Sequence, residues 1–328
     1  MRIVIFTEGG SNIGLGHLSR CGALHDEIIN RGIAVEIVLS GDGDNFDLAN
    51  QMSITNANWL SVDYLEACIN STDYCIVDSY LAPEYLYRTI STSCRKALFL
   101  DDNSRIIYPE GIVVNPSLCV ENLDYAMNEG VTYLLGRDYI ILRTPFEKIE
   151  KKVIAKEVKN VLITLGGADT KHVIPRIFTE ICEKHPNIKF NVIMGNYFQE
   201  SQTIQKDKPK NIDLFNNIDA ELMKTLMVNA DLAITAAGQT IYELLATSTP
   251  FIAIKTADNQ INNVRGLKEI NPDQIVIEYS DNLFLEKLNI VFSKFLKKEE
   301  RKNQMDCYQY TIDGLGKKRI LDCFLGEN

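Results

Sequence analysis

Short runs of apolar, often β-branched residues alternate with longer amphipathic stretches along most of this sequence. This alternation restricts the fold more than any other feature, because strands covered by helices on both faces read as continuous apolar runs. The pattern therefore predicts an α/β protein with parallel sheets. In the first half, the predicted strands are residues 2–7, 34–39, 75–78, 97–100 and 112–114.

A second series of the same kind begins after a charged stretch. Its predicted strands are residues 161–165, 190–194, 232–235, 251–254 and 274–277. Both series open with a strand, a glycine-rich turn and a helix, which predicts two Rossmann-like doubly wound domains. We expect these domains at 1–146 and 159–328, joined by a linker at 147–158, with the last helix a candidate to cross back to the first. The carboxyl ends of the strands are expected to face a cleft between the domains.

Composition excludes several classes of protein. The 34 Lys and Arg residues against 44 Asp and Glu give a net charge of −10, which lacks the basic footprint of a nucleic-acid-binding protein. The eight cysteines include no Cys-x-x-Cys pair, which indicates reduced thiols in a cytoplasmic protein rather than a zinc site. The apolar run at 3–6 is too short for a signal peptide, and no window is long enough to span a membrane. The sequence gives no prediction of oligomeric state.

The first candidate site is the loop and helix start that contain Gly14, Gly16, His17 and Arg20. Glycines let the backbone approach a ligand closely, and a helix N-terminus offers free N–H groups. The loop departs from the dinucleotide fingerprint, since the third glycine and the acidic residue after the second strand are missing. A helix dipole disfavours an imidazolium at this end, so a neutral His17 is expected to serve as a general base. The alternative is a histidine that only caps its helix.

The second candidate site lies where a predicted strand ends in small residues and a helix begins. It contains Ala237, Gly238, Gln239, Thr240 and Glu243. Backbone N–H groups at such a turn are expected to hold a pyrophosphate, and the carboxylate of Glu243 is expected to accept both hydroxyls of a ribose. The alternative for Glu243 is a surface residue that supports its helix through a nearby charge.

Two further segments carry polar or flexible residues at the ends of strands in the second half. Asn259, Gln260 and Asn263 are candidates to contact a ligand in the cleft, although amides also favour turns and helix caps. Gly166 and Gly167 form a flexible turn expected to face the same cleft, and the alternative is an ordinary tight turn.

Acidic residues also end strands in the first half. Asp78, which is followed by Tyr80, and the pair Asp101 and Asp102 are expected at the cleft. Asp42 and Asp44 suggest a divalent ion on a diphosphate, as in metal-dependent glycosyltransferases, but their neighbours are more typical of a polar surface loop. We therefore expect no metal and no cofactor.

These motifs together resemble a known family over about residues 1–280. The family comprises the nucleotide-sugar hydrolase of pseudaminic acid biosynthesis and its spore-coat polysaccharide relatives, and it is similar in fold to the lipid II glycosyltransferase, a GT-B architecture. The residues that carry the resemblance are Gly14-x-Gly16-His17-x-x-Arg20-Cys21, Asp78-x-Tyr80, Asp101-Asp102, Asn115-Pro116, Gly136-x-x-Tyr139-x-x-Leu142-Arg143, Gly166-Gly167-x-Asp169 and Gly238-x-x-x-x-Glu243.

The resemblance implies a metal-independent hydrolysis of UDP-diacetamido-trideoxy-altrose or a related UDP-sugar, with C1–oxygen cleavage and inversion. It makes His17 the base that activates water and places Tyr80 near the sugar or the leaving group. UDP is expected on the second domain, with Glu243 at the ribose. The sequence departs from the family at residues 7–10, where Thr-Glu-Gly-Gly replaces an Asp-Ala/Ser-Ser stretch, at Ser79, which replaces a histidine, and at 144–146, where the family has Glu before Phe. These departures are expected to line the sugar pocket.

Two other functions remain as alternatives. An inverting GT-B glycosyltransferase would use His17 to deprotonate an acceptor hydroxyl in place of water. A sugar-nucleotide binding subunit would use the same residues without catalysis. The same scaffold hosts all three functions, so only the site distinguishes them.

Overall fold

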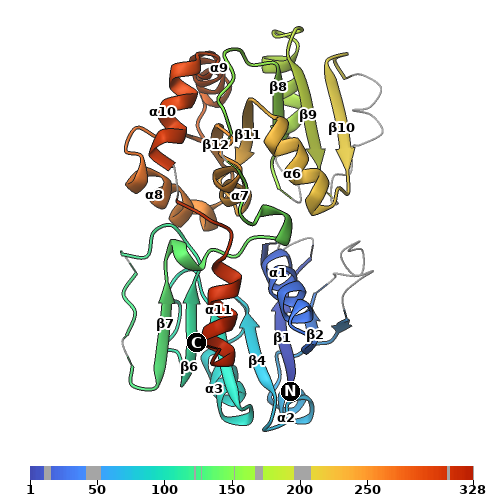
Figure 1. Cartoon of the computed structure of the whole chain (residues 1–328), viewed down its shortest axis with the longest axis vertical. Helices are drawn as coiled ribbons and strands as arrows, with labels where there is room; N and C mark the ends of the chain where they lie inside the picture. The colour runs from blue at the N-terminus through green and yellow to red at the C-terminus, as the bar shows by residue number, and fades with distance from the viewer. Residues whose placement is uncertain are drawn as a thin grey trace. The chain divides into compact units, whose positions relative to one another are not determined.

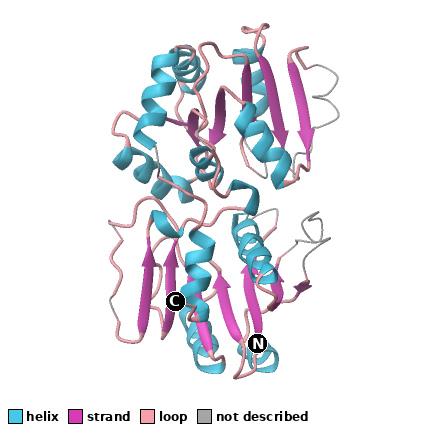
Figure 2. Ribbon diagram, viewed as in Figure 1, coloured by secondary structure: helices cyan, strands magenta, loops and turns pink. Residues whose placement is uncertain are grey.

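The computed structural model describes residues 1–10, 16–41, 53–121, 123–126, 128–150, 152–166, 173–195, 208–308 and 311–327. The chain divides into two compact units, each with its own core. Unit 1 is Met1–Thr144 with Gly314–Asn328, and unit 2 is Pro145–Asp313. Both units are parallel sheets with helices (Figures 1 and 2).

In the described part of unit 1, seven parallel strands form one sheet in the order β3-β2-β1-β4-β5-β6-β7. Residues Ile3, Val4, Ile5 and Phe6 of the central strand are all fully buried, because helices cover both faces of the sheet. The strands are β1 (Arg2–Glu8), β2 (Ala34–Ser40), β3 (Ile54–Asn56), β4 (Tyr74–Asp78), β5 (Lys96–Leu100), β6 (Gly111–Asn115) and β7 (Val131–Leu135).

The two faces of this sheet build two separate hydrophobic clusters. Ile3 and Ile5 pack with α1 (Gly16–Asn30) and α11 (Gly316–Leu325), which lie on the same face (Figure 1). Val4 and Phe6 pack on the opposite face with α2 (Val62–Cys68) and α3 (Glu84–Ser93). The two-residue period of the strand thus assigns alternate side chains to different helix layers.

The last helix, α11, belongs to unit 1, although the predicted second domain extended to residue 328. A side chain at Gly316 would meet the carbonyl oxygen of Ile140 at 2.2 Å, so only glycine permits this approach. Lys317 is fully buried, and its Nζ donates to Thr144 Oγ1 at 2.7 Å. Arg319 Nη1 donates to the carbonyl of Asp138 at 3.0 Å. These contacts anchor α11 on the segment 138–144, which follows β7 in unit 1.

Six parallel strands, counted over the residues that the structure describes, form the sheet of unit 2 in the order β10-β9-β8-β11-β12-β13. Numbered along each unit, the first six strands of both sheets have the same order, third-second-first-fourth-fifth-sixth, which is that of the Rossmann fold. The predicted fold class is confirmed. The strands are β8 (Asn160–Thr164), β9 (Lys189–Met194), β10 (Ile212–Asn216), β11 (Leu232–Ala236), β12 (Phe251–Lys255) and β13 (Val276–Glu278).

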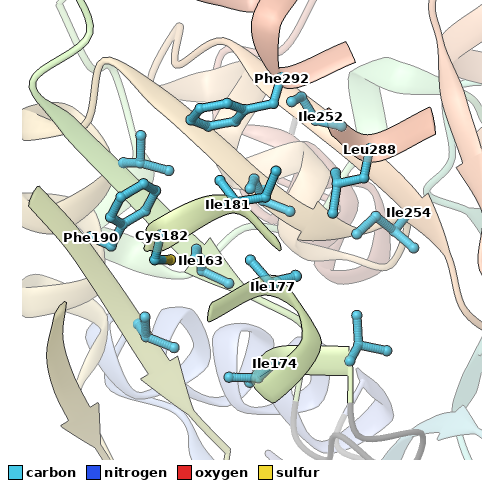
Figure 3. Close-up of a cluster of buried hydrophobic side chains, with 14 of the residues drawn as sticks. Ile163, Ile174, Ile177, Ile181, Cys182, Phe190, Ile252, Ile254, Leu288 and Phe292 are labelled. Atoms are coloured by element: carbon cyan, nitrogen blue, oxygen red, sulfur yellow. The ribbon is translucent and has the colours of Figure 1, made fainter. Parts of the chain in front are cut away.

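One face of this second sheet packs against helices through an aliphatic and aromatic cluster (Figure 3). Ile163 and Phe190 come from the sheet, Ile177 and Ile181 from the segment that covers it, and Phe292 from a later helix. Among the described residues of unit 2, the α-helices are α4 (Val173–Ile177), α6 (Ala220–Asn229), α7 (Thr240–Ala246), α8 (Ile261–Ile270), α9 (Phe284–Phe295) and α10 (Lys298–Tyr308), and the π-helical turn η5 (Phe178–Cys182) follows α4.

The segment 147–158, predicted as a linker, contacts unit 2. Lys152 Nζ donates to the carbonyl oxygens of Met227 and Ala230, and Arg301 Nη2 donates to the carbonyl of Ala155 at 3.0 Å. Its role as a linker stays a prediction.

Two further observations concern the class of protein. None of the helices in the described ranges combines the length and the apolar character that crossing a membrane requires. All eight cysteines lie in described residues and are free thiols.

Candidate functional site

The candidate site of unit 1 lies at the carboxyl ends of β1 and β4, which are neighbours in the sheet. The strand order reverses here, and ligands of doubly wound folds bind at such a point. The first five residues of α1 bring His17 and Arg20 to this edge, β4 ends with Asp78, and Tyr80 follows in the loop after β4. Asp102 follows β5.

His17 and Asp78 form a buried dyad. His17 Nδ1 lies 2.7 Å from Asp78 Oδ1, and the two side chains are 7% and 0% exposed. Burial alone would raise the pKa of Asp78, but the charge of Arg20 and the contact with His17 outweigh it and lower this pKa. An ionised carboxylate only accepts hydrogen bonds, so Nδ1 carries a proton, and in the neutral imidazole Nε2 then holds the lone pair. This tautomer is the one that a general base requires.

Arg20 joins this dyad to a second carboxylate. Its Nε and Nη2 donate to the two oxygens of Asp78 at 2.6 and 2.5 Å, and its Nη1 donates to Asp102 Oδ1 at 2.7 Å. Burial opposes the charge of Arg20, but the two adjacent carboxylates outweigh it and raise the pKa of its guanidinium. Burial of Asp102 is likewise outweighed by Arg20, and the pKa of Asp102 is lowered. The three groups form one fixed ionic network.

Tyr80 completes the cluster. Its hydroxyl donates to Asp102 Oδ2 at 2.5 Å, and its ring meets the His17 ring edge-on, with 4.4 Å between centroids. Burial and the charge of Asp102 raise the pKa of Tyr80, so the phenol stays protonated at neutral pH. The Tyr80 hydroxyl uses its proton in the hydrogen bond to Asp102. Its oxygen lone pairs can therefore accept a hydrogen bond from water or from a hydroxyl group.

The sequence predicted four members of this cluster and did not assign the fifth. His17, Arg20, Tyr80 and Asp102 were predicted as site residues and lie together. Asp78 was expected at this edge, but its role as the partner of His17 was not predicted. The local signal for Asp78 is an acidic residue at the end of a buried strand, but Glu8 at the end of β1 has the same signal, so it does not specify the partner of His17. Gly16, also predicted, is exposed at the first position of α1, and a side chain there would meet nothing within 4 Å.

The candidate site of unit 2 lies at the carboxyl end of β11. The N–H of Ala237 donates to the carbonyl of Ile254 at 2.9 Å, which extends the sheet. The carbonyl of Ala237 accepts from Asn263 Nδ2 at 2.9 Å, and Asn263 Oδ1 accepts from the Tyr242 hydroxyl at 2.6 Å. The N–H of Ala237 is therefore used by the fold, and the amide of Asn263 braces the turn.

The next residues, Gly238, Gln239 and Thr240, lead into α7. Gln239 caps this helix without a side-chain hydrogen bond, and the first N–H groups of a helix lack intrahelical acceptors. A side chain at Gly238 would meet nothing within 4 Å, so the space beside it is open. Glu243, in the first turn of the helix, is 8% exposed. Their roles at a pyrophosphate and a ribose stay predictions.

The remaining predicted residues of unit 2 lie on two other strand ends. Gln260 closes the turn after β12, since its Oε1 accepts from the N–H of Thr256 at 2.8 Å and its Nε2 donates to Thr256 Oγ1 at 3.1 Å. Asn259 is exposed in the 3-10 turn η6 (Asp258–Gln260). Gly166, after β8, is exposed with a φ of +92°. The side chain of Gln260 therefore has a structural role.

Several predicted positions lie outside the described residues. They are Gly14 in the first glycine-rich loop, Gly167 and Asp169 in the second, and the acidic pair Asp42 and Asp44.

A protein-family model matches the second half of the chain. Residues 160–318 match the family model described as the glycosyltransferase family 28 C-terminal domain.

Three curated relatives are similar over about three quarters of the chain or more. An uncharacterized protein of Methanocaldococcus jannaschii is 30% identical over 274 residues, covering 77% of this chain and 55% of that protein. The pseudaminic acid cytidylyltransferase and UDP-2,4-diacetamido-2,4,6-trideoxy-beta-L-altropyranose hydrolase of Helicobacter pylori is 26% identical, covering 76% and 43%. The spore coat polysaccharide biosynthesis protein SpsG of Bacillus subtilis is 25% identical, covering 84% and 87%. The chain thus spans about half the length of the first two.

Solved structures show the same fold. MurG of Acinetobacter baumannii has a TM-score of 0.65 at 16% identity, covering 99% of this chain and 100% of that one. The calicheamicin glycosyltransferase CalG4 has a TM-score of 0.65 at 12% identity, covering 99% and 98%. The curated relatives from Helicobacter pylori and Bacillus subtilis confirm the resemblance stated from the motifs, and the solved structures show that the chain has the GT-B fold.

Proposed function

We propose that this chain is an enzyme that hydrolyses a UDP-activated amino sugar, such as UDP-diacetamido-trideoxy-altrose, to the free sugar and UDP. The observation that carries the proposal is the buried His17–Asp78 dyad at the strand-order reversal of unit 1. The names of the relatives support a sugar-nucleotide enzyme in surface polysaccharide or pseudaminic-type sugar biosynthesis. The Helicobacter relative is named for two activities, a cytidylyltransferase and a hydrolase. Similarity alone therefore does not select hydrolysis for this chain, and the proposal also needs the geometry of the site.

In this mechanism, His17 Nε2 takes a proton from water while the water oxygen attacks C1 of the sugar. The C1–oxygen bond breaks, its electron pair goes to the β-phosphate oxygen, and the sugar is released with inversion. Asp78 holds the imidazole in its tautomer and stabilises the imidazolium that forms. Arg20 and Asp102 hold Asp78 and Tyr80 in place. Tyr80 accepts a hydrogen bond at the sugar.

Unit 2 is proposed to hold the nucleotide. The N–H groups of Gly238, Gln239 and Thr240 would bind the diphosphate, where the helix dipole favours negative charge, and Glu243 would bind the ribose hydroxyls. Charge that develops on the leaving diphosphate would then be stabilised by fixed backbone dipoles. The mechanism assigns no step to a metal or a cofactor. A cytoplasmic location stays a prediction.

An inverting glycosyltransferase is the second candidate. It is favoured by the match of residues 160–318 to a glycosyltransferase model and by the fold shared with MurG and CalG4. The same dyad would then take a proton from an acceptor hydroxyl. The two functions differ in whether UDP is released without an acceptor.

The deciding experiment follows UDP release from a panel of UDP-sugars in EDTA and ¹⁸O-water without acceptor. Hydrolysis predicts UDP with ¹⁸O in the released sugar, lost in His17→Gln. His25→Gln is the matched control, because His25 is also buried on α1 but contacts Asp26. UDP binding without turnover on the whole panel would reject hydrolysis of these sugars and favour the transferase. Wild-type turnover in His17→Gln would reject the role of the dyad.

A further inference from the structure

Glu8 is a fully buried carboxylate that the proposed mechanism does not use, and the sequence placed it only among the departures expected to line the sugar pocket. It is the last residue of β1, next to β4 in the sheet. It accepts hydrogen bonds from the Ser79 hydroxyl at 2.6 Å and from the N–H groups of Tyr80 and Leu81 at 2.7 and 3.3 Å. All three donors belong to the turn that follows β4. The position of a buried carboxylate is well defined when several fixed donors satisfy it.

Ser79 extends this bonding through the turn. Its hydroxyl oxygen also accepts from the N–H groups of Leu81 and Ala82 at 3.0 and 2.9 Å. On the other side, the Tyr87 hydroxyl donates to the carbonyl of Ser79 at 3.0 Å, and Arg105 Nη2 donates to the carbonyls of Ser79 and Ala82 at 3.2 and 2.9 Å. The turn 79–82 is thus held from both sides.

The residue that this turn presents is Tyr80. Its backbone N–H is bonded to Glu8, while its side chain contacts His17 and Asp102. A shift of the turn would move the Tyr80 ring away from the His17 ring. Glu8 and Ser79 are also two positions at which the sequence departs from the family that it resembles, and they contact each other across 71 positions of sequence.

We infer that Glu8 is a positioning residue, which fixes the turn 79–82 so that Tyr80 lies against His17 and Asp102. The catalytic consequence rests on the proposed function, whereas the positioning itself does not. Replacing Glu8 by glutamine keeps the size of the side chain but offers an amide donor to atoms that are already donors. With the NH₂ toward Ser79, the Ser79 Oγ would receive three N–H donors and its own proton would lose its acceptor; with the amide flipped, the NH₂ would face the N–H of Tyr80.

The test of positioning is a nuclear magnetic resonance signal that needs no substrate. Because an aromatic ring lies 4.4 Å away, the ring protons of His17 carry a ring-current shift from Tyr80. The chain has four histidines, and His17→Gln identifies the signal. Tyr80→Leu gives the value without the aromatic ring. We expect Glu8→Gln and Ser79→Ala to move the His17 signals most of the way to that value.

The matched control is Glu27→Gln. Glu27 is also buried in unit 1, but its carboxylate contacts Arg31, the residue after the end of α1, so the His17 signals should not move. Ser79→Ala keeps the carboxylate and removes one hydroxyl, so it preserves the test if Glu8→Gln fails to fold. Wild-type His17 signals in a folded Glu8→Gln or Ser79→Ala variant would overturn the inference.

Kinetics provide the second arm. If the hydrolysis is confirmed, Glu8→Gln should lower kcat by about 10- to 100-fold with little change in KM, the size expected for misplacing a reacting group by about 1 Å. Changes in Glu8→Gln and Ser79→Ala should be non-additive in the double variant, because both break the same hydrogen bond. If the wild-type protein shows no hydrolase activity, the proposed function is rejected. The His17 signals alone then decide whether Glu8 positions Tyr80. An unchanged kcat in an active enzyme would reject the catalytic consequence.

Discussion

Replacing Asp78 by asparagine tests the buried network at the candidate site. Asparagine has nearly the same size as aspartate, so the change removes charge and acceptor capacity without creating a cavity. The wild-type carboxylate accepts from His17 Nδ1 at 2.7 Å and from Arg20 Nε and Nη2 at 2.6 and 2.5 Å. The new amide keeps one oxygen acceptor and turns an NH₂ donor toward groups that are donors themselves.

The expected loss of unfolding free energy follows from this geometry. Removing one partner of a buried ion pair costs about 3–5 kcal/mol, because the other charge is left uncompensated. Arg20 keeps Asp102 as a partner at 2.7 Å, so we expect the lower end, about 3 kcal/mol. If the proposed function holds, kcat should also fall by about 10³-fold or more, since an amide at Nδ1 favours the tautomer without a free Nε2 lone pair.

Urea unfolding measured by Trp59 fluorescence provides the assay. Trp59 is the only tryptophan of the chain, is fully buried, and donates to the carbonyl of Thr7 in unit 1 at 2.8 Å. Asp322→Asn is the control: its contact with Arg31 lies in the same unit, but Asp322 is 46% exposed, so we expect a change below about 1 kcal/mol. A loss below about 1 kcal/mol in Asp78→Asn would refute the reasoning, because a single neutral hydrogen bond contributes that much.

The unfolding free energy of the wild type relative to Asp78→Asn should depend on pH. The pKa of Asp78 is lower in the folded protein than its ordinary value of 3.8, so near that pH the unfolded state binds more protons. The stabilisation by Asp78 is therefore fully present above about pH 4 and is lost as pH falls toward the folded pKa. The difference between wild type and Asp78→Asn should therefore narrow as the pH falls below about 4. A difference that widens on acidification would contradict the lowered pKa.

Three other changes are predicted from local geometry. Tyr80→Phe removes a short hydrogen bond to the carboxylate of Asp102 and should lower the unfolding free energy of unit 1 by about 1–3 kcal/mol. The same Trp59 fluorescence measures this loss, and an unchanged unfolding free energy would contradict the contact. Gly41→Ala would place a methyl group 2.0 Å from the carbonyl oxygen of Gly9 at a φ of +137°, so the unfolding free energy of unit 1 should fall by about 3 kcal/mol or more. Wild-type urea unfolding would show that the backbone relaxes at low cost. Gly238→Ala adds a methyl group to open space, so the temperature of thermal unfolding should not change. UDP binding measured by calorimetry should weaken, and wild-type affinity would argue against a diphosphate at this turn.

The fold was predictable where its signals are local. Strands β1, β2, β4, β5 and β6 match the predicted runs because continuous apolar residues reveal a strand buried on both faces. The short β3, and β7 and β10 with their partly exposed side chains, gave no such signal and were not predicted. The place of α11 in unit 1 was only a possibility, because a contact as close as that of Gly316 with Ile140 leaves no trace in periodicity.

The candidate site divides in the same way. The motif around His17 and Arg20 identified two members, since a glycine-rich turn before a helix is a local pattern. The amides of Gln260 and Asn263 were also identified as polar groups at strand ends, but their hydrogen bonds to Thr256 and to Ala237 brace the fold. Sequence does not distinguish a polar side chain that serves a ligand from one that satisfies the backbone, because both favour the same position.

By itself, the sequence determined two parallel α/β units and the residue types at the ends of their strands, because apolar periodicity and glycine turns are properties of neighbouring residues. Only the tertiary structure decided that Asp78 orients His17, that Arg20 joins Asp78 to Asp102, and that Glu8 holds the turn of Tyr80. These pairs are separated by 58 to 82 positions of sequence. They meet because β1 lies beside β4, and β4 beside β5, and the order of parallel strands is fixed by long-range packing rather than by local propensity.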